Sequence, residues 1–115
     1  MKKIKEFYEE IGGDYNAALL IMLNDDFIER MLDKFFAKNT YNDVLSSYER
    51  KDFESLFSAV HSFKGVVGNL GLSSLFGISN IITEAARSLK EVNIDKEINE
   101  LKKIYTIVED TYRNK

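Results

Sequence analysis

Apolar residues recur every three or four positions along most of this chain, which is the spacing that places them on one face of an α-helix. No segment shows the alternating apolar and polar positions of a strand bounded by hairpin turns. The chain also contains no proline, so long helices can continue without interruption. The pattern therefore predicts an all-α protein. It is clearest in one helical face formed by Phe53, Leu56, Phe57, Val60, Phe63, Val67 and Leu70.

Capping residues and glycines predict where these helices begin and end. Gly12 and Gly13 stop a first short helix, and Asp14 is a typical N-terminal cap for a second. A break is expected near Asn39, and the last residues of the chain, 111–115, are expected to fray. The expected helices are 2–10, 14–23, 25–50 with that break, 52–70, 73–90 and 94–112.

The connections between the longer helices are short, which places consecutive helices side by side and antiparallel. A length of 115 residues is that of one domain. We therefore expect a single domain, 1–115, whose residues 25–112 form an antiparallel up-and-down four-helix bundle. The short N-terminal helices in residues 1–23 are expected to pack against one end of this bundle.

Composition narrows the classes of function. The chain has no cysteine and one histidine, which excludes disulfides, thiolate metal sites and the usual multi-histidine metal sites. A formal net charge of −3 argues against nucleic-acid binding. No apolar run approaches the roughly 20 residues that span a bilayer, and the acidic residues that soon follow Met1 argue against a signal peptide. We expect a cytoplasmic monomer that binds neither nucleic acid nor membrane.

The only histidine of the chain lies in the central helical stretch, beside two glycines. His61 falls about 120° from the centre of the apolar face, on the flank that borders solvent. Gly65 and Gly68 follow it by one and two turns, although a glycine inside a helix costs roughly 1 kcal/mol relative to alanine. Lys64 lies between the histidine and the edge of the apolar face. These residues form a candidate site.

The arrangement suits a phosphoryl group carried on nitrogen. A neutral imidazole is a competent nucleophile. Because helical side chains lean toward the N-terminus, a glycine at Gly65 leaves space above the ring of His61, and Gly68 extends the same groove. The ammonium group of Lys64 can neutralise an anion held there.

These residues resemble the signature of a known family. The sequence His-Ser-Phe-Lys-Gly at residues 61–65, followed by Leu-Gly at 70–71, resembles the His-x-Leu/Phe-Lys-Gly motif and the aliphatic-Gly pair of histidine-containing phosphotransfer (HPt) domains. Residues 51–53 are similar to the family's short acidic turn before the histidine helix, and residues 81–87 are similar to its next helix. The resemblance covers about residues 25–112 and implies the same bundle fold.

The resemblance implies a phosphorelay carrier in two-component signalling. His61 would accept a phosphoryl group from the phospho-aspartate of a receiver domain and pass it to another receiver, so the chain is not expected to be an enzyme by itself. Lys64 would neutralise the phosphoryl oxygens, and Gly65 would keep the ring accessible. Arg87 resembles a basic residue on the next helix of some members. If residue 80 or 81 lies level with His61, Arg87 is about 9 Å further along the axis.

The implied partners are response-regulator receiver domains and a hybrid histidine kinase. The chain is expected to need no cofactor of its own, because the receiver domain would supply Mg²⁺. In agreement, the sequence has no glycine-rich phosphate loop. Val66 and Val67 depart from the family, which often has Ser or Ala there, and this departure concerns helix packing more than the site.

Two other functions are compatible with parts of this pattern. A non-catalytic helical-bundle interaction domain, binding receiver or kinase partners, would keep the fold without phosphotransfer, but the intact His-Lys-Gly triplet argues against it. A small hydrolase could use His61 as a general base. It would need a serine with a partner acid, and Ser62 lies about 100° from His61 around the helix.

Overall fold

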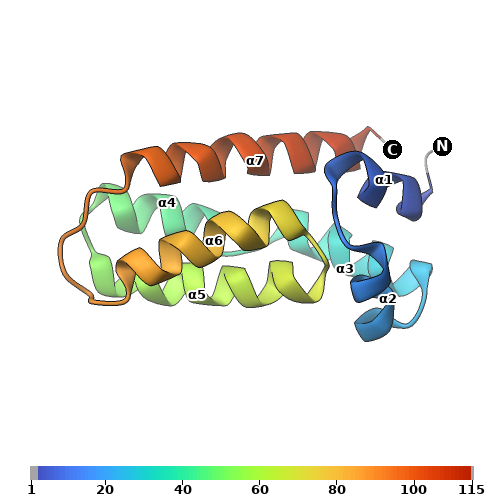
Figure 1. The fold of residues 1–115 in the computed structure, drawn as a ribbon, viewed down its shortest axis with the longest axis horizontal. Coiled ribbons are helices and arrows are strands. Elements are labelled where there is room, and N and C mark those ends of the chain that lie inside the picture. Colours follow the sequence, from blue (N-terminus) through green and yellow to red (C-terminus); the bar gives the residue numbers. More distant parts are fainter. Residues whose placement is uncertain (1–2, 115) are drawn as a thin grey trace.

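In the computed structural model, which describes residues 3–114, the chain forms seven α-helices and no strand within that range (Figure 1). The all-α prediction is therefore confirmed. Residue 2, where the first helix was expected to begin, lies outside the described residues. The helices are α1 (Ile4–Ile11), α2 (Tyr15–Met22), α3 (Asp25–Ala37), α4 (Tyr41–Glu49), α5 (Phe53–Asn69), α6 (Ser73–Ala86) and α7 (Asp95–Arg113).

Local polar contacts at the helix starts follow the sequence closely. The carboxylate of Asp14 accepts a hydrogen bond from the backbone amide three residues later (2.9 Å), and the side chains of Asn24 (2.8 Å) and Asp52 (3.2 Å) do the same for α3 and α5. Each satisfies one of the backbone amides that a helix start leaves without a partner. Gly12 ends α1 in the left-handed region at φ 66°, which glycine adopts without strain. The expected break near Asn39 is also present.

Two expectations about helix ends are wrong. Helix α6 stops at Ala86 instead of residue 90, and Leu89 has a positive φ of 61° that ends the turn. The end of the chain does not fray through residue 113, because Tyr112 is buried and its hydroxyl donates to the carboxylate of Asp33 at 2.5 Å.

Helix α5 runs along one long edge of a molecule with extents of 44 × 24 × 21 Å (Figure 1). It packs against α4 on one side and α6 on the other, and α6 packs in turn against α7 (Figure 1). Two members of the expected apolar face, Phe53 and Phe57, are only half-buried. The other five are buried in the core: Leu56, Val60, Phe63, Val67 and Leu70.

Helices α1 and α2 fasten the turn between α5 and α6. The hydroxyl of Tyr8 donates to the carbonyl oxygen of Leu70 at 2.5 Å, and the amide of Asp14 donates to the carbonyl oxygen of Gly71 at 2.8 Å. Burial raises the pKa of Tyr8, so its hydroxyl keeps its proton. These two hydrogen bonds hold the end of α5 against the N-terminal helices. Gly71 itself has a φ of 67°.

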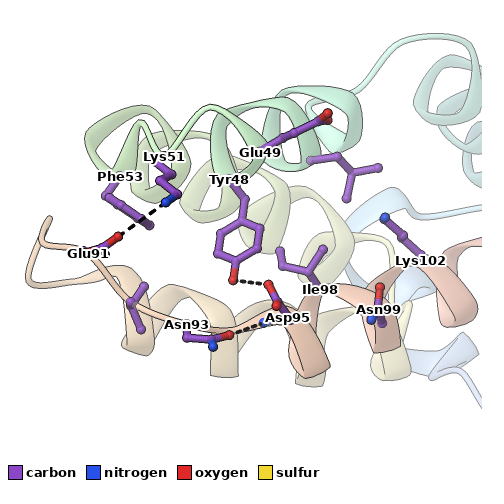
Figure 2. A pocket seen from close by; sticks show the side chains of 12 residues that line it. Tyr48, Glu49, Lys51, Phe53, Glu91, Asn93, Asp95, Ile98, Asn99 and Lys102 are labelled. Atoms are coloured by element: carbon purple, nitrogen blue, oxygen red, sulfur yellow. Dashed lines mark hydrogen bonds and ion pairs between the residues drawn. The ribbon is translucent and has the colours of Figure 1, made fainter.

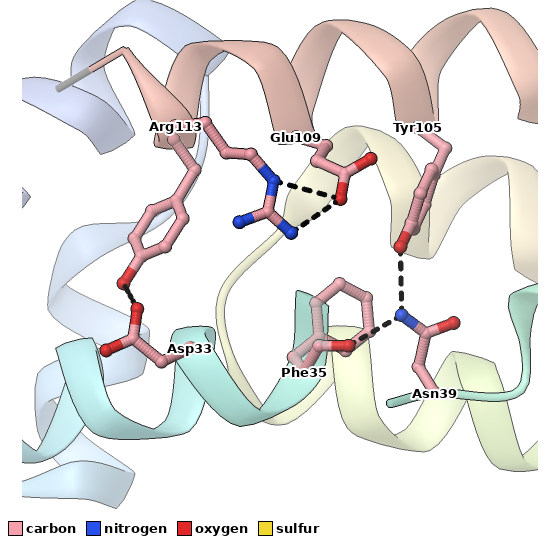
Figure 3. A network of polar contacts seen from close by, with 7 residues as sticks. Asp33, Phe35, Asn39, Tyr105, Glu109 and Arg113 are labelled. Carbon is pink, nitrogen blue, oxygen red and sulfur yellow. Dashed lines mark hydrogen bonds and ion pairs between the residues drawn. The ribbon is translucent and has the colours of Figure 1, made fainter. Parts of the chain in front are cut away.

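Aromatic rings and polar contacts connect α3 and the residues after it with α7 (Figure 3). The side-chain amide of Asn39 donates to the carbonyl oxygen of Phe35 (2.6 Å) and to the hydroxyl of Tyr105 (2.9 Å). The ring of Tyr105 also stacks on Tyr41 at 3.8 Å between centroids. No helix within the described range 3–114 is both long and apolar enough to cross a membrane.

Candidate functional site

His61 lies on the middle of α5 with its side chain exposed, as the helical wheel predicts. Its ring stacks on the ring of Phe57, one turn earlier, with centroids 5.8 Å apart and planes inclined by 20°. Helical side chains lean toward the N-terminus, which brings the imidazole over the residue four positions before it. The stacking fixes one side of the imidazole and leaves the other side to solvent.

The position one turn after His61 is open. A Cβ atom built on Gly65 meets no heavy atom within 4 Å, apart from the backbone of its own helix and its chain neighbours. Gly65 is itself exposed. A large group can therefore approach the imidazole from the C-terminal side of the helix.

Lys64 crosses from α5 to α6. Its ammonium group donates to the side-chain carbonyl oxygen of Asn80 at 3.1 Å and lies 5.9 Å from the centre of the Phe76 ring. A neutral amide and an aromatic face hold this cation without cancelling its charge. The cation is thus held on the α5–α6 face, one turn from His61.

Gly68 does not extend the open groove, and this expectation is wrong. A Cβ atom at Gly68 would lie 3.1 Å from two carbon atoms of the Phe76 ring. The missing side chain therefore lets α6 approach α5 closely, and the Phe76 ring lies where a side chain at Gly68 would point. Of the two glycines that follow His61, only Gly65 leaves room for a Cβ atom without a contact within 4 Å.

Arg87 is closer to the site than the sequence suggested. Its guanidinium group lies 5.7 Å from the centre of the Phe57 ring, on which His61 also stacks. Three contacts between α5 and α6 agree on how the two antiparallel helices are aligned. They are Lys64 with Asn80, Gly68 with Phe76, and Phe57 with Arg87.

That register places Thr83 level with His61, in place of residue 80 or 81. Arg87 is then about 6 Å further along the axis, and not 9 Å. Its guanidinium group and the imidazole of His61 both contact the ring of Phe57.

Glu84 forms an ion pair with Arg87, whose guanidinium donates to it at 2.9 Å and 3.1 Å. These hydrogen bonds, the charge of Arg87 and more weakly the charge of Lys64 hold the pKa of Glu84 below its usual range. The same carboxylate raises the pKa of Arg87. The face around His61 therefore carries two cations and one anion.

Sequence reasoning missed three neighbours of this site. Phe57 was assigned to the core face, although its position four residues before His61 gave a usable signal. Asn80 and Glu84 come from the neighbouring helix, and only the register between α5 and α6 reveals them.

A larger surface hollow lies elsewhere, at the end of the molecule where α4, α5 and α7 meet (Figure 2). It has a volume of about 770 Å³. Within it the hydroxyl of Tyr48 donates to Asp95 at 2.6 Å, and Lys51 pairs with Glu91 at 3.8 Å. None of the residues proposed from the sequence lines it. Among the described residues, no group of three or more potential metal-ligating side chains is placed to hold a metal ion.

No protein-family model, curated protein or solved structure matches this chain. The function is therefore argued from the geometry around His61.

Proposed function

We propose that this chain is a histidine phosphotransfer carrier of the HPt type. The observation that carries the proposal is the exposed imidazole of His61 next to the open position at Gly65. Two cations, Lys64 and Arg87, lie within one to two turns of it on the same pair of helices. An accessible nucleophile with positive charge nearby is what a phosphoryl carrier needs.

The proposed fold is an antiparallel up-and-down four-helix bundle, with α3 and α4 together forming its first member and α1 and α2 covering one end. Contacts of α4 with α5, of α5 with α6 and of α6 with α7 support this arrangement. Ring contacts between Phe36 of α3 and both Tyr105 and Tyr112 of α7 would close the bundle. Such a bundle leaves the α5–α6 face free for a partner.

The proposed reaction is the transfer of a phosphoryl group from a receiver-domain aspartyl phosphate to His61. A ring nitrogen of His61 attacks phosphorus, an N–P bond forms, and the P–O bond to the aspartate breaks with the carboxylate as leaving group. The proton on the other ring nitrogen stays there or passes to water. Transfer to a second receiver reverses these bonds. Mg²⁺ on the receiver would offset phosphoryl charge.

The charged neighbours have distinct proposed roles. Lys64 would exchange its bond to Asn80 for a bond to a phosphoryl oxygen, which is a stronger, charge-assisted contact. Phe57 would hold the imidazole of His61 by stacking, and its ring also contacts the guanidinium group of Arg87. Glu84 would keep Arg87 in place and, being negative, would limit the phosphoryl-binding strength of the face.

A panel of purified receiver domains, each charged with ³²P, tests the proposal. We expect at least one receiver to transfer label rapidly to the wild-type chain, and the label to be lost in acid and kept in alkali, as an N–P bond requires. His61→Gln should take up no label while keeping its helical circular dichroism. Ser62→Ala is the matched control and should be labelled like the wild type.

Label on His61→Gln with the same acid lability would reject the assignment. A wild-type chain that binds receivers tightly but accepts no label would favour the non-catalytic interaction domain instead.

A further inference from the structure

Helix α2 exposes a group of large apolar side chains that the monomer does not use. Leu20, Ile21 and Leu23 are 83%, 52% and 80% exposed, respectively. The helix carries no charged residue between Tyr15 and Met22. A surface patch of this kind usually marks an interaction site.

Leu23 adds a second observation. Its φ of 78° is in the region that favours glycine, and a leucine there is strained. Because its side chain is largely exposed, packing within one chain does not offset this strain. A contact outside the chain would explain why leucine occupies the position.

An apolar groove of about 540 Å³ lies next to this patch, between α3 and α5. The side chain of Met22, at the end of α2, forms part of its wall. On α5 the groove is lined from the side of Ser62 and Val66, and Val66 is about 140° from His61 around the helix. Its other apolar walls come from Met31, Phe35, Phe63 and Leu70.

The charged residues beside the patch and most of those at the groove are of opposite sign. The groove is lined by two cations, Lys34 and Lys38, and by one acid, Asp43. Neither lysine forms an ion pair with any residue in the described part of the chain. The exposed acid Asp26 follows Leu23 at the start of α3. Two α3 helices placed antiparallel across a twofold axis would bring the acidic start of each beside the basic end of the other.

We propose that the chain forms a twofold-symmetric homodimer in which α2 of each copy covers the α3–α5 groove of the other. The second copy is the favoured occupant because one chain supplies both the apolar helix and the groove with the matching charge, as a self-complementary interface requires. This dimer differs from the monomer expected from the sequence. It leaves His61 accessible in both copies and does not depend on the proposed phosphotransfer.

Sedimentation equilibrium of the full chain, from low to high micromolar concentration, tests the proposal. We expect a reversible monomer–dimer equilibrium. Leu20→Glu should raise the dissociation constant at least about tenfold, because a side chain buried only in the dimer becomes charged. Ile107→Glu is the matched control, since Ile107 is 53% exposed on α7 and lies outside the interface. It should leave the dissociation constant unchanged.

Leu23→Gly separates an effect on folding from an effect on association. Glycine removes the strain at the positive φ, so the monomer should unfold at a higher temperature while the dimer weakens. The double variant Lys34→Glu/Lys38→Glu should also dimerise poorly, and mixing it with Asp26→Lys should restore association as a heterodimer. A wild-type chain that sediments as a monomer over the whole range would overturn the proposal. So would a Leu20→Glu variant that dimerises like the wild type.

Discussion

Two glycine-containing segments, one inside α5 and one at its C-terminal end and in the turn that follows, differ in what approaches them. At Gly65, next to His61, an added Cβ atom would meet nothing within 4 Å. At the end of the helix, a Cβ atom at Gly68 would lie 3.1 Å from the Phe76 ring, and one at Gly71 would clash with the carbonyl oxygen of Asp14. The first segment is open to solvent, and the second is packed between α6 and the N-terminal helices.

The difference shows that a missing side chain can serve opposite purposes. At the packed segment, glycine lets backbone and rings of the same chain come close, so the benefit is measured in folding stability. At the open segment the helix gains nothing from glycine and loses helix propensity. Because glycine at position 65 does not stabilise the fold, we attribute it to function. In our proposal, Gly65 keeps His61 accessible.

Substitution of Gly71 should have the largest effect on stability. Gly71→Ala combines a strained φ of 67° with a clash against backbone that cannot turn away, so we expect a loss of about 3 kcal/mol or more. Urea unfolding measures it. Gly12→Ala is the matched control, because Gly12 has a φ of 66° but open space, and it should cost only about 1 kcal/mol. Equal losses would show that the contact with Asp14 contributes nothing.

Substitution of Gly65 should separate stability from transfer. Gly65→Leu should fold, because the position is open, but should accept label from a receiver at least about tenfold more slowly, because the new side chain blocks the approach to His61. Gly65→Ala should stabilise the chain by about 0.5–1 kcal/mol through helix propensity. Unimpaired transfer by the leucine variant would remove access as the explanation for this glycine.

Gly68→Ala should lie between these cases. The gain in helix propensity, about 1 kcal/mol, is opposed by the ring of Phe76, which must move by a few tenths of an ångström. We expect a net change within about 0.5 kcal/mol of zero. The same substitution in a Phe76→Ala background should recover most of the propensity gain. If the gain is the same in both backgrounds, the ring does not limit the approach of α6.

Glu84→Gln should produce the smallest change. It removes the anion near His61 and frees Arg87, so transfer to His61 should rise about two- to threefold at low salt. The increase should shrink at high ionic strength, whereas thermal unfolding should hardly change. An increase that does not depend on salt would contradict this electrostatic explanation.

Local chemistry made much of the fold predictable. The caps at Asp14, Asn24 and Asp52 act within three residues of themselves, and the expected starts of these three helices lie within one residue of the observed starts. The end of α6 was placed too late because residues 87–90 continue an apolar helical pattern. The positive φ of Leu89, 61°, depends on the surrounding structure and is not indicated by a leucine in the sequence.

The site was predictable to the same local extent. His61, Lys64 and Gly65 lie on one helix, where the wheel gives their relative directions. The role of Gly68 and the approach of Arg87 to Phe57 depend on how far α6 is shifted along α5. A shift of two or three residues changes every cross-helix pair, and no pattern within one helix records it.

The bond between the amide of Asp14 and the carbonyl oxygen of Gly71 uses only main-chain atoms on both sides. Most exchanges of side chain at residue 14 would therefore leave this bond intact, proline excepted. The number of residues between α1 and α2 is under a much stricter constraint, since one residue more or less would carry the amide out of reach. Among homologues of this chain, the length of that short connection should vary less than the identity of its residues.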